Sequence, residues 1–196
     1  MISATYADKP LVVRLLAEAF DTNRSINYIV KQDDRRNKRI KVLMEYSFDR
    51  CFRYGSVLLS NNKDACALLL FPDKKNITVG DLVADFLMVI RVSGLFALKR
   101  IMDREKSIKK NYPPTKMLYL WFLAVSPRKQ GKGLGKELLG EIIKISAEHK
   151  LPIYLETSMP ENLTFYKKMG FEVYNEIDFS YNLFLLRRNI ALNGKP

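Results

Sequence analysis

Residues 123–136 read LAVSPRKQGKGLGK, with three glycines, Gly131, Gly133 and Gly135, close together. The apolar run over residues 117–125 enters this stretch, and a continuous run of that kind predicts a strand buried on both faces. Behind the glycines, apolar residues recur at helical spacing and predict an amphipathic helix. The order strand, glycine-rich loop, helix is therefore the unit from which the rest of the fold can be worked out.

The glycine-rich loop has the properties of an anion-binding site. The first N–H groups of a helix lack intrahelical acceptors, and the positive end of the helix dipole lies beside them. Glycines let the backbone approach a phosphate closely. The basic residues around the glycines are Arg128, Lys129, Lys132 and Lys136. We therefore expect the loop to bind an anion through its backbone.

Two common phosphate-binding motifs do not fit this loop. The P-loop needs Ser or Thr after its Gly-Lys, but Glu137 follows Gly135 and Lys136. The dinucleotide fingerprint G-x-G-x-x-G, started at Gly131, needs a glycine where Lys136 stands. The alternative interpretation is that the three glycines bind no ligand and only form a tight turn at the start of the helix.

A second motif follows after one predicted helix and one predicted strand. Residues 161–173 read ENLTFYKKMGFEV, with an Asn, then a Tyr, then Gly-Phe entering a strand. Together with Gln130-x-x-Gly133-x-Gly135 after an apolar strand, this order resembles the GCN5-related N-acetyltransferase (GNAT) superfamily. The resemblance covers roughly residues 117–173, and the N-terminal half agrees only in the order of its elements.

The resemblance implies an α/β (α+β) fold of the GNAT type. Its mixed, mostly antiparallel central sheet would be flanked by helices and splayed between strands 117–125 and 153–157. Acetyl-coenzyme A, the implied cofactor, would lie in the V-shaped gap between these two strands. The length suits one domain, so we expect residues 1–196 to form a single acetyltransferase domain.

The resemblance also implies roles for individual residues. Strand backbone would pair with the pantetheine arm, and the loop would donate N–H groups to the pyrophosphate. The expected cofactor-binding residues are Leu123, Ala124, Val125, Gln130, Gly131, Lys132, Gly133, Leu134, Gly135, Lys136, Asn162 and Tyr166. Asn162 would hydrogen-bond the pantetheine region, and the Tyr166 phenol would protonate the departing thiolate. The alternatives are a polar residue in the cap region for Asn162 and a packed core tyrosine for Tyr166.

The general base is less clearly indicated. Many relatives place a carboxylate on the central strand, but residues 119–122 offer none. Glu156 is an acid in an otherwise apolar strand beside the gap, and a buried carboxylate is costly unless it is paired or used. Glu156 and Tyr166 are therefore the candidate catalytic residues. A salt bridge from Glu156 to a lysine is an alternative interpretation, as is a reaction with a water-relayed base or none.

Periodicity and turn signals predict the remaining elements. A short strand over residues 2–5 precedes a helix capped by Asp8, and another helix covers residues 36–53. The other expected elements are a hairpin of 56–60 with 65–71, two helices within 78–110 that break near Ser93 and Gly94, a strand at 152–157, a helix from Ser158 to Gly170, and strands at 171–174 and 181–187. We expect the helices of residues 78–110 to line the acceptor side.

Charge and composition narrow the possible partners. The net charge of +12 indicates either a polyanionic partner or a solvated basic surface. The basic residues are spread along the chain with no aromatic-interleaved stripe, so we expect no nucleic-acid partner. The apolar stretch 82–101 contains Asp85 and Arg91, which argue against a spanning helix, and we expect no membrane partner. With a single histidine, His149, we expect no metal site. No signal peptide is visible, which favours a cytoplasmic protein.

The expected reaction is direct acetyl transfer to an acceptor amine of a small molecule or peptide, with a hydroxyl acceptor as an alternative. Cys51 and Cys66 lie outside the motifs and are expected to be buried and reduced, so no acetyl-cysteine intermediate is expected. Two rival hypotheses are a non-catalytic coenzyme A-binding protein of the same fold and a different phosphate-binding enzyme. A homodimer is left open.

Overall fold

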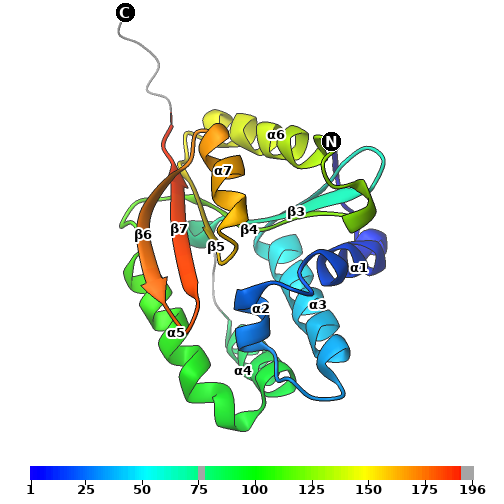
Figure 1. Ribbon diagram of the computed structural model, residues 1–196, viewed down its shortest axis with the longest axis vertical. Helices are drawn as coiled ribbons and strands as arrows, with labels where there is room; N and C mark the ends of the chain where they lie inside the picture. The colour runs from blue at the N-terminus through cyan, green and yellow to red at the C-terminus, as the bar shows by residue number, and fades with distance from the viewer. Residues whose placement is uncertain (75–77, 191–196) are drawn as a thin grey trace, which may run out of the picture.

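The computed structural model describes residues 1–74 and 78–190 (Figure 1). Its strands form one seven-stranded sheet in the order β1-β2-β3-β4-β5-β7-β6. The strands are β1 (Ile2–Ser3), β2 (Gly55–Leu59), β3 (Ala65–Leu70), β4 (Leu118–Val125), β5 (Ile153–Thr157), β6 (Glu172–Asp178) and β7 (Asn182–Arg188). Every pairing is antiparallel except that of β4 with β5. The expected mixed, mostly antiparallel sheet is confirmed.

Helices cover both faces of this sheet. They are α1 (Lys9–Ala19), α2 (Arg24–Ile29), α3 (Arg36–Tyr54), α4 (Val79–Ser93), α5 (Leu98–Lys110), α6 (Leu134–Glu148) and α7 (Glu161–Lys168), with a short 3-10 turn, η3 (Leu95–Ala97), between α4 and α5. Alternate residues of one strand enter different cores: Leu68 of β3 packs with α1 and α3, and Leu69 packs with α6 and α7. This alternation explains why the central strands are apolar throughout.

The two central strands separate soon after they meet. β4 pairs with β5 only at Leu118 with Ile153 and at Tyr119 with Tyr154. On its other side β4 carries a bulge, because Phe122 pairs with Leu68 and Leu120 with Leu69, which leaves Trp121 unmatched. Within the described residues, the edge of β4 beyond Tyr119 that faces β5 has no strand partner. The expected splay is confirmed.

The first predicted helix start is confirmed at Asp8, and a second needs correction. Asp8 precedes α1 as its N-cap residue, although its carboxylate accepts from the N–H and hydroxyl of Thr5 at 2.9 and 2.8 Å and so caps the preceding 3-10 turn. The helix predicted from Ser158 begins at Glu161. The Ser158 hydroxyl instead accepts a hydrogen bond from the N–H of Ser25 on α2, a helix that sequence periodicity did not predict.

Two further observations concern the cysteines and the search for a membrane-spanning helix. Cys51 and Cys66 are both buried, as expected. In the part of the chain that the structure describes, no helix combines the length and apolarity needed to cross a membrane.

Candidate active site

The glycine-rich loop leaves a row of backbone N–H groups without helical acceptors. Gly131 and Gly133 adopt positive φ angles of 76° and 83°, and Gly133 is the N-cap of α6. The first N–H with a helical acceptor is that of Glu137, which donates to the Gly133 carbonyl at 3.0 Å. Within the described residues, no hydrogen bond satisfies the N–H groups of residues 133–136. This arrangement is that of a backbone anion site at a helix N-terminus.

The loop is held against the open edge of β4. A Cβ added to Gly135 would lie 3.5 Å from the Val125 side chain, so the first turn of α6 packs directly on the strand end. The Gln130 amide donates to the Val125 carbonyl at 3.4 Å, at the end of the same strand. Lys132 and Lys136 are exposed beside the free N–H groups, where their charge favours an anion.

A cavity of about 510 Å³ opens where β4 and β5 separate. Of the residues predicted to form the site, it brings together Leu123, Glu156, Asn162 and Tyr166. Ala124 is buried in the core with α1 and α3, and it lies opposite Cys66 in the pairing of β4 with β3. Val125 and the loop residues Gln130, Gly131, Lys132, Gly133, Leu134, Gly135 and Lys136 lie outside the cavity lining. The helices of residues 78–110 supply several lining residues.

Tyr166 is both packed and aimed at this cavity. Its ring makes edge contacts with Phe165 and Phe171, yet within the described residues its hydroxyl has no hydrogen-bond partner. Burial raises the pKa of Tyr166 to about 12, so the phenol keeps its proton at neutral pH. Asn162 is exposed one turn earlier and makes no side-chain hydrogen bond in the described chain, while Pro160 holds the N-cap position of α7. Both side chains are free to meet a ligand.

Glu156 is held by two tyrosines rather than by a lysine. Its Oε1 accepts from the Tyr112 hydroxyl at 3.2 Å, and its Oε2 accepts from the Tyr119 hydroxyl at 3.0 Å. Among the described residues it forms no salt bridge, so the lysine partner weighed from sequence is wrong. Burial raises the pKa of Glu156 from 4.5 to about 7, and the nearby positive charge of Arg104 opposes that rise. The carboxyl group can therefore exchange a proton near neutral pH.

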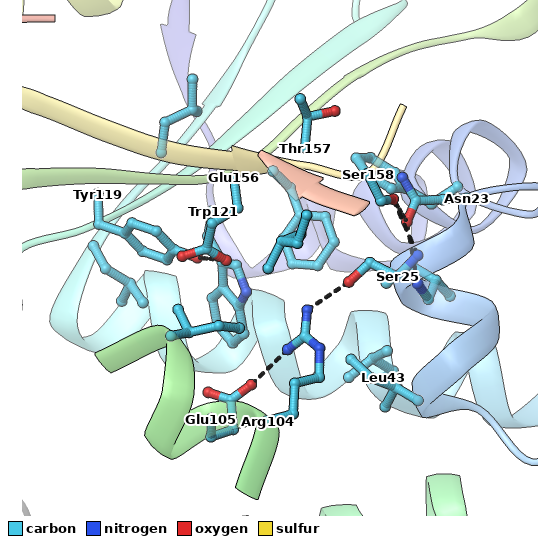
Figure 2. Close-up of a pocket in the computed structure, with 18 of the residues that line it drawn as sticks. Asn23, Ser25, Leu43, Arg104, Glu105, Tyr119, Trp121, Glu156, Thr157 and Ser158 are labelled. Carbon is cyan, nitrogen blue, oxygen red and sulfur yellow. Dashed lines mark hydrogen bonds and ion pairs between the residues drawn. The ribbon is translucent and has the colours of Figure 1, made fainter. Parts of the chain in front are cut away.

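Arg104 of α5 organises the far wall of the cavity (Figure 2). Its guanidinium donates to the Ser25 hydroxyl at 2.6 Å, to the Tyr181 hydroxyl at 3.0 Å and to Glu105 at 2.8 Å. The N–H of Ser25 in turn donates to the Ser158 hydroxyl just after β5. Figure 2 shows Arg104 reaching up from its helix while Glu156 and Tyr119 meet on the opposite side.

Sequence reasoning missed this wall because its parts are far apart in the chain. The only local signal was Asn23, whose side chain accepts from the Ile26 N–H at 3.1 Å and starts α2. Because Asn23 is a common N-cap residue directly before Arg24, it could have indicated the start of α2. Nothing in the sequence joins Ser25 to Arg104 or Tyr181.

Comparisons with known proteins agree with this geometry. The family model described as acetyltransferase (GNAT) family matches residues 96–171, which include β4, the glycine-rich loop, β5 and α7. An uncharacterised N-acetyltransferase of Schizosaccharomyces pombe is 38% identical over 71 residues, which are 36% of this chain and 26% of that protein.

Over residues 96–171 the chain matches the GNAT acetyltransferase family.

Solved structures agree in fold over nearly the whole length of the chain. One similar structure is a Corynebacterium glutamicum protein described as histone acetyltransferase HPA2 and related acetyltransferase. It has a TM-score of 0.73 at 20% identity, and the match covers 99% of this chain and 97% of that protein's chain. Arylalkylamine N-acetyltransferase 2 of Aedes aegypti has a TM-score of 0.65 at 14% identity, with coverages of 96% and 97%. At these identities the likeness shows the fold. The chain spans about a quarter of the length of the yeast relative.

Proposed function

We propose that this protein, as one acetyltransferase domain, transfers the acetyl group of acetyl-coenzyme A directly to the amine of a small molecule or a peptide end. The observation that carries the proposal is the cavity between β4 and β5, which joins a free strand edge to Glu156 and Tyr166. Its lining is mostly apolar and aromatic, with Tyr119 and Trp121 on one wall. An acceptor with an apolar body and one amine suits such a lining.

The residues present fit a pyrophosphate-bearing thioester. The unpaired N–H groups of residues 133–136 would bind the pyrophosphate, with Gln130, Gly131, Lys132 and Lys136 around it. The free edge of β4 from Phe122 to Val125 offers backbone groups to the amide-rich pantetheine arm. Asn162 stands beside this path as a further hydrogen-bonding group. When bound, acetyl-coenzyme A supplies the carbonyl carbon that the acceptor amine attacks.

Each candidate catalytic residue has a distinct proton to move. Glu156, with its pKa near 7, accepts a proton from the acceptor nitrogen as the new C–N bond forms. Backbone N–H groups on the β4 edge between Leu123 and Val125 would polarise the thioester carbonyl. The Tyr166 hydroxyl, which keeps its proton at neutral pH, would supply the proton that the departing thiolate needs. Solvent then returns a proton to Tyr166 and removes one from Glu156.

Two measurements test this proposal. Isothermal titration should show binding of acetyl-coenzyme A in preference to NAD and ATP, because the loop lacks the motifs of those sites. A thiol-release assay across a panel of primary amines and matched alcohols should then show turnover with at least one amine. Tight binding without thiol release would favour a non-catalytic coenzyme A-binding protein, and turnover with alcohols alone would favour an O-acetyltransferase.

A further inference from the structure

Helix α4 presents an apolar face to solvent. Val79, Leu82, Val83, Phe86 and Leu87 are all exposed, Val79 by 78%. Their i, i+3, i+4, i+7, i+8 spacing places them on one side of the helix. The opposite side packs on α3, so this exposed row is not needed for the core. A row of large apolar side chains in water is the mark of an interaction surface.

The apolar character continues into the turn that follows α4. Gly94, at φ 82°, ends the helix, and η3 then carries Leu95, which is 61% exposed, and Phe96, which is fully exposed. In Figure 1 this junction of α4 and α5 lies at the end of the molecule opposite α6. The five α4 residues together with Leu95 and Phe96 are called the apolar tip below.

The charges around the apolar tip are mainly positive. Both carboxylates of α4 are turned to α3, where Asp81 pairs with Arg50 at 2.7 Å and Asp85 contacts the same guanidinium. Residues 91–110 contain seven Lys or Arg and two acidic residues. Next to Phe96, a shallow hollow is lined by Tyr28, Lys99, Arg100, Asp103, Arg104, Ser107 and Phe179. Two of its exposed residues, Lys99 and Arg100, are cationic, against one carboxylate, that of Asp103.

We propose that the apolar tip binds the surface of an anionic lipid membrane. Leu95 and Phe96 would enter the interface between headgroups and acyl chains, and the α4 face would lie against it. Lys99 and Arg100 would meet the lipid phosphates. Exposed Phe and Leu beside Lys and Arg form the pattern that holds amphipathic segments in the plane of an anionic membrane.

Charge complementarity favours this occupant over a second copy of the chain. An isologous contact through the apolar tip would bring Lys99 and Arg100 of two copies together, in a protein that already carries a net charge of +12. The proposal also refines the expectation of no membrane partner. That expectation rested on the absence of a spanning segment, and binding at a membrane surface requires none.

Vesicle co-sedimentation tests the proposal with the intact chain. We expect the protein to sediment with phosphatidylcholine vesicles that contain phosphatidylglycerol, to bind less without the anionic lipid, and to be released by salt. Leu95→Ser with Phe96→Ser should weaken binding by about ten- to a hundredfold for each large apolar side chain that the membrane buries. Lys99→Gln should weaken it by about fivefold, since one juxtamembrane cation contributes that much.

Matched controls keep the test informative. Phe52→Ser removes an aromatic residue on α3 that is 43% exposed, and Lys144→Gln removes an exposed lysine on α6; neither should change vesicle binding. Circular dichroism and acetyl-coenzyme A binding should be unaltered in the Leu95/Phe96 variant. No binding by the wild type, or equal binding by that variant, would overturn the proposal. A further result would also overturn it: the wild type forms a dimer in analytical ultracentrifugation, the Leu95/Phe96 variant is monomeric, and neither protein binds vesicles.

Discussion

The two sides of the β4–β5 gap are built in different ways. On the proposed cofactor side, backbone N–H groups of one continuous segment, residues 133–136, would form the binding surface, and glycine conformations leave them exposed to a ligand. On the acceptor side, the polar groups are side chains from distant elements, such as Ser25 of α2, Arg104 of α5 and Glu156 of β5. A backbone site depends on local conformation, so it can persist while side chains elsewhere change. A side-chain site can take a new acceptor after a few substitutions.

The largest effect should come from the cofactor side. Gly133→Glu places a carboxylate beside N–H groups that would bind an anion, at a φ of 83° that only glycine adopts easily. We expect acetyl-coenzyme A affinity in isothermal titration to fall by at least about a hundredfold, or roughly 3 kcal/mol. The left-handed backbone should strain the new residue by roughly 1–2 kcal/mol, but a Cβ at Gly133 meets no atom within 4 Å, so the protein should still fold. Gly140→Glu, in the middle of α6 with equal space, is the control. Unchanged affinity in a folded Gly133→Glu protein would contradict the pyrophosphate assignment.

The next effect should appear at Tyr166, where the two sides meet. Tyr166→Phe keeps the ring contacts with Phe165 and Phe171 and removes a hydroxyl that has no partner in the described chain. Stability and cofactor affinity should therefore hardly change. A general acid contributes about a hundred- to ten-thousand-fold, so kcat should fall by at least tenfold.

Steady-state kinetics with thermal melts checks this prediction. Tyr6→Phe, which removes a surface hydroxyl far from the cavity, serves as the control for loss of a phenol. A fully active Tyr166→Phe enzyme would leave Tyr166 as a packing residue only.

Glu156 should set the pH dependence on the acceptor side. A base must be deprotonated to act, and the pKa of Glu156 is raised to about 7, so kcat/KM should rise with pH through an inflection near that value. Glu156→Gln should remove the inflection and lower kcat/KM by about tenfold or more. Glu161→Gln, an exposed acid at the start of α7, should leave the profile unchanged. An inflection that persists in Glu156→Gln would point to the acceptor amine instead.

The same carboxyl group should make the folded protein less stable as the pH rises, whereas an acid paired with a cation makes it more stable. Its pKa is higher in the folded chain than the ordinary value of 4.5, so folding favours the protonated form. The contribution of Glu156 to the free energy of unfolding is fully present below that ordinary pKa, and it is lost as the pH rises to about 7. The melting temperature of Glu156→Gln relative to wild type should therefore increase between about pH 5 and about pH 8.

The comparison of the two sides also explains what the sequence could predict. The central strand and the glycine-rich loop follow from local signals, an apolar run and the glycines at 131, 133 and 135. The splay of the sheet was implied by the family resemblance, which these glycines and the Asn-Tyr-Gly-Phe order of residues 162–171 carry. Glu156 was identified as an unusual acid in an apolar strand, but its partners were not. Tyr112 and Tyr119 reach it only because β4 and β5 meet before they diverge.

Elements with weak periodicity were beyond sequence reasoning. α2 is only six residues long, too short for a helical repeat to show, and it is fixed by contacts made after the chain has folded. The extent of β6 was also underestimated, because its exposed residues give no apolar alternation. Long-range hydrogen bonds, such as that of Arg104 with Tyr181, carry no local signature at all.

The smallest kinetic effect should come from Arg104, which acts on Glu156 through space. Its charge lowers the pKa of Glu156, so Arg104→Met should raise that pKa further and move the kcat/KM inflection to higher pH. The variant also removes the donor to the Tyr181 hydroxyl and leaves Ser25 with only the Tyr181 hydroxyl, at 3.3 Å, as a side-chain donor. This loss should lower stability by about 1–3 kcal/mol. Arg104→Lys separates the two roles. It should return the inflection toward the wild-type pH because the charge is kept, while the melting temperature stays low because one ammonium cannot satisfy both hydroxyls in the guanidinium geometry. If Arg104→Met loses stability but keeps the inflection, Arg104 only supports the wall of the cavity, and the electrostatics of the acceptor side rest on Glu156 and its two tyrosines.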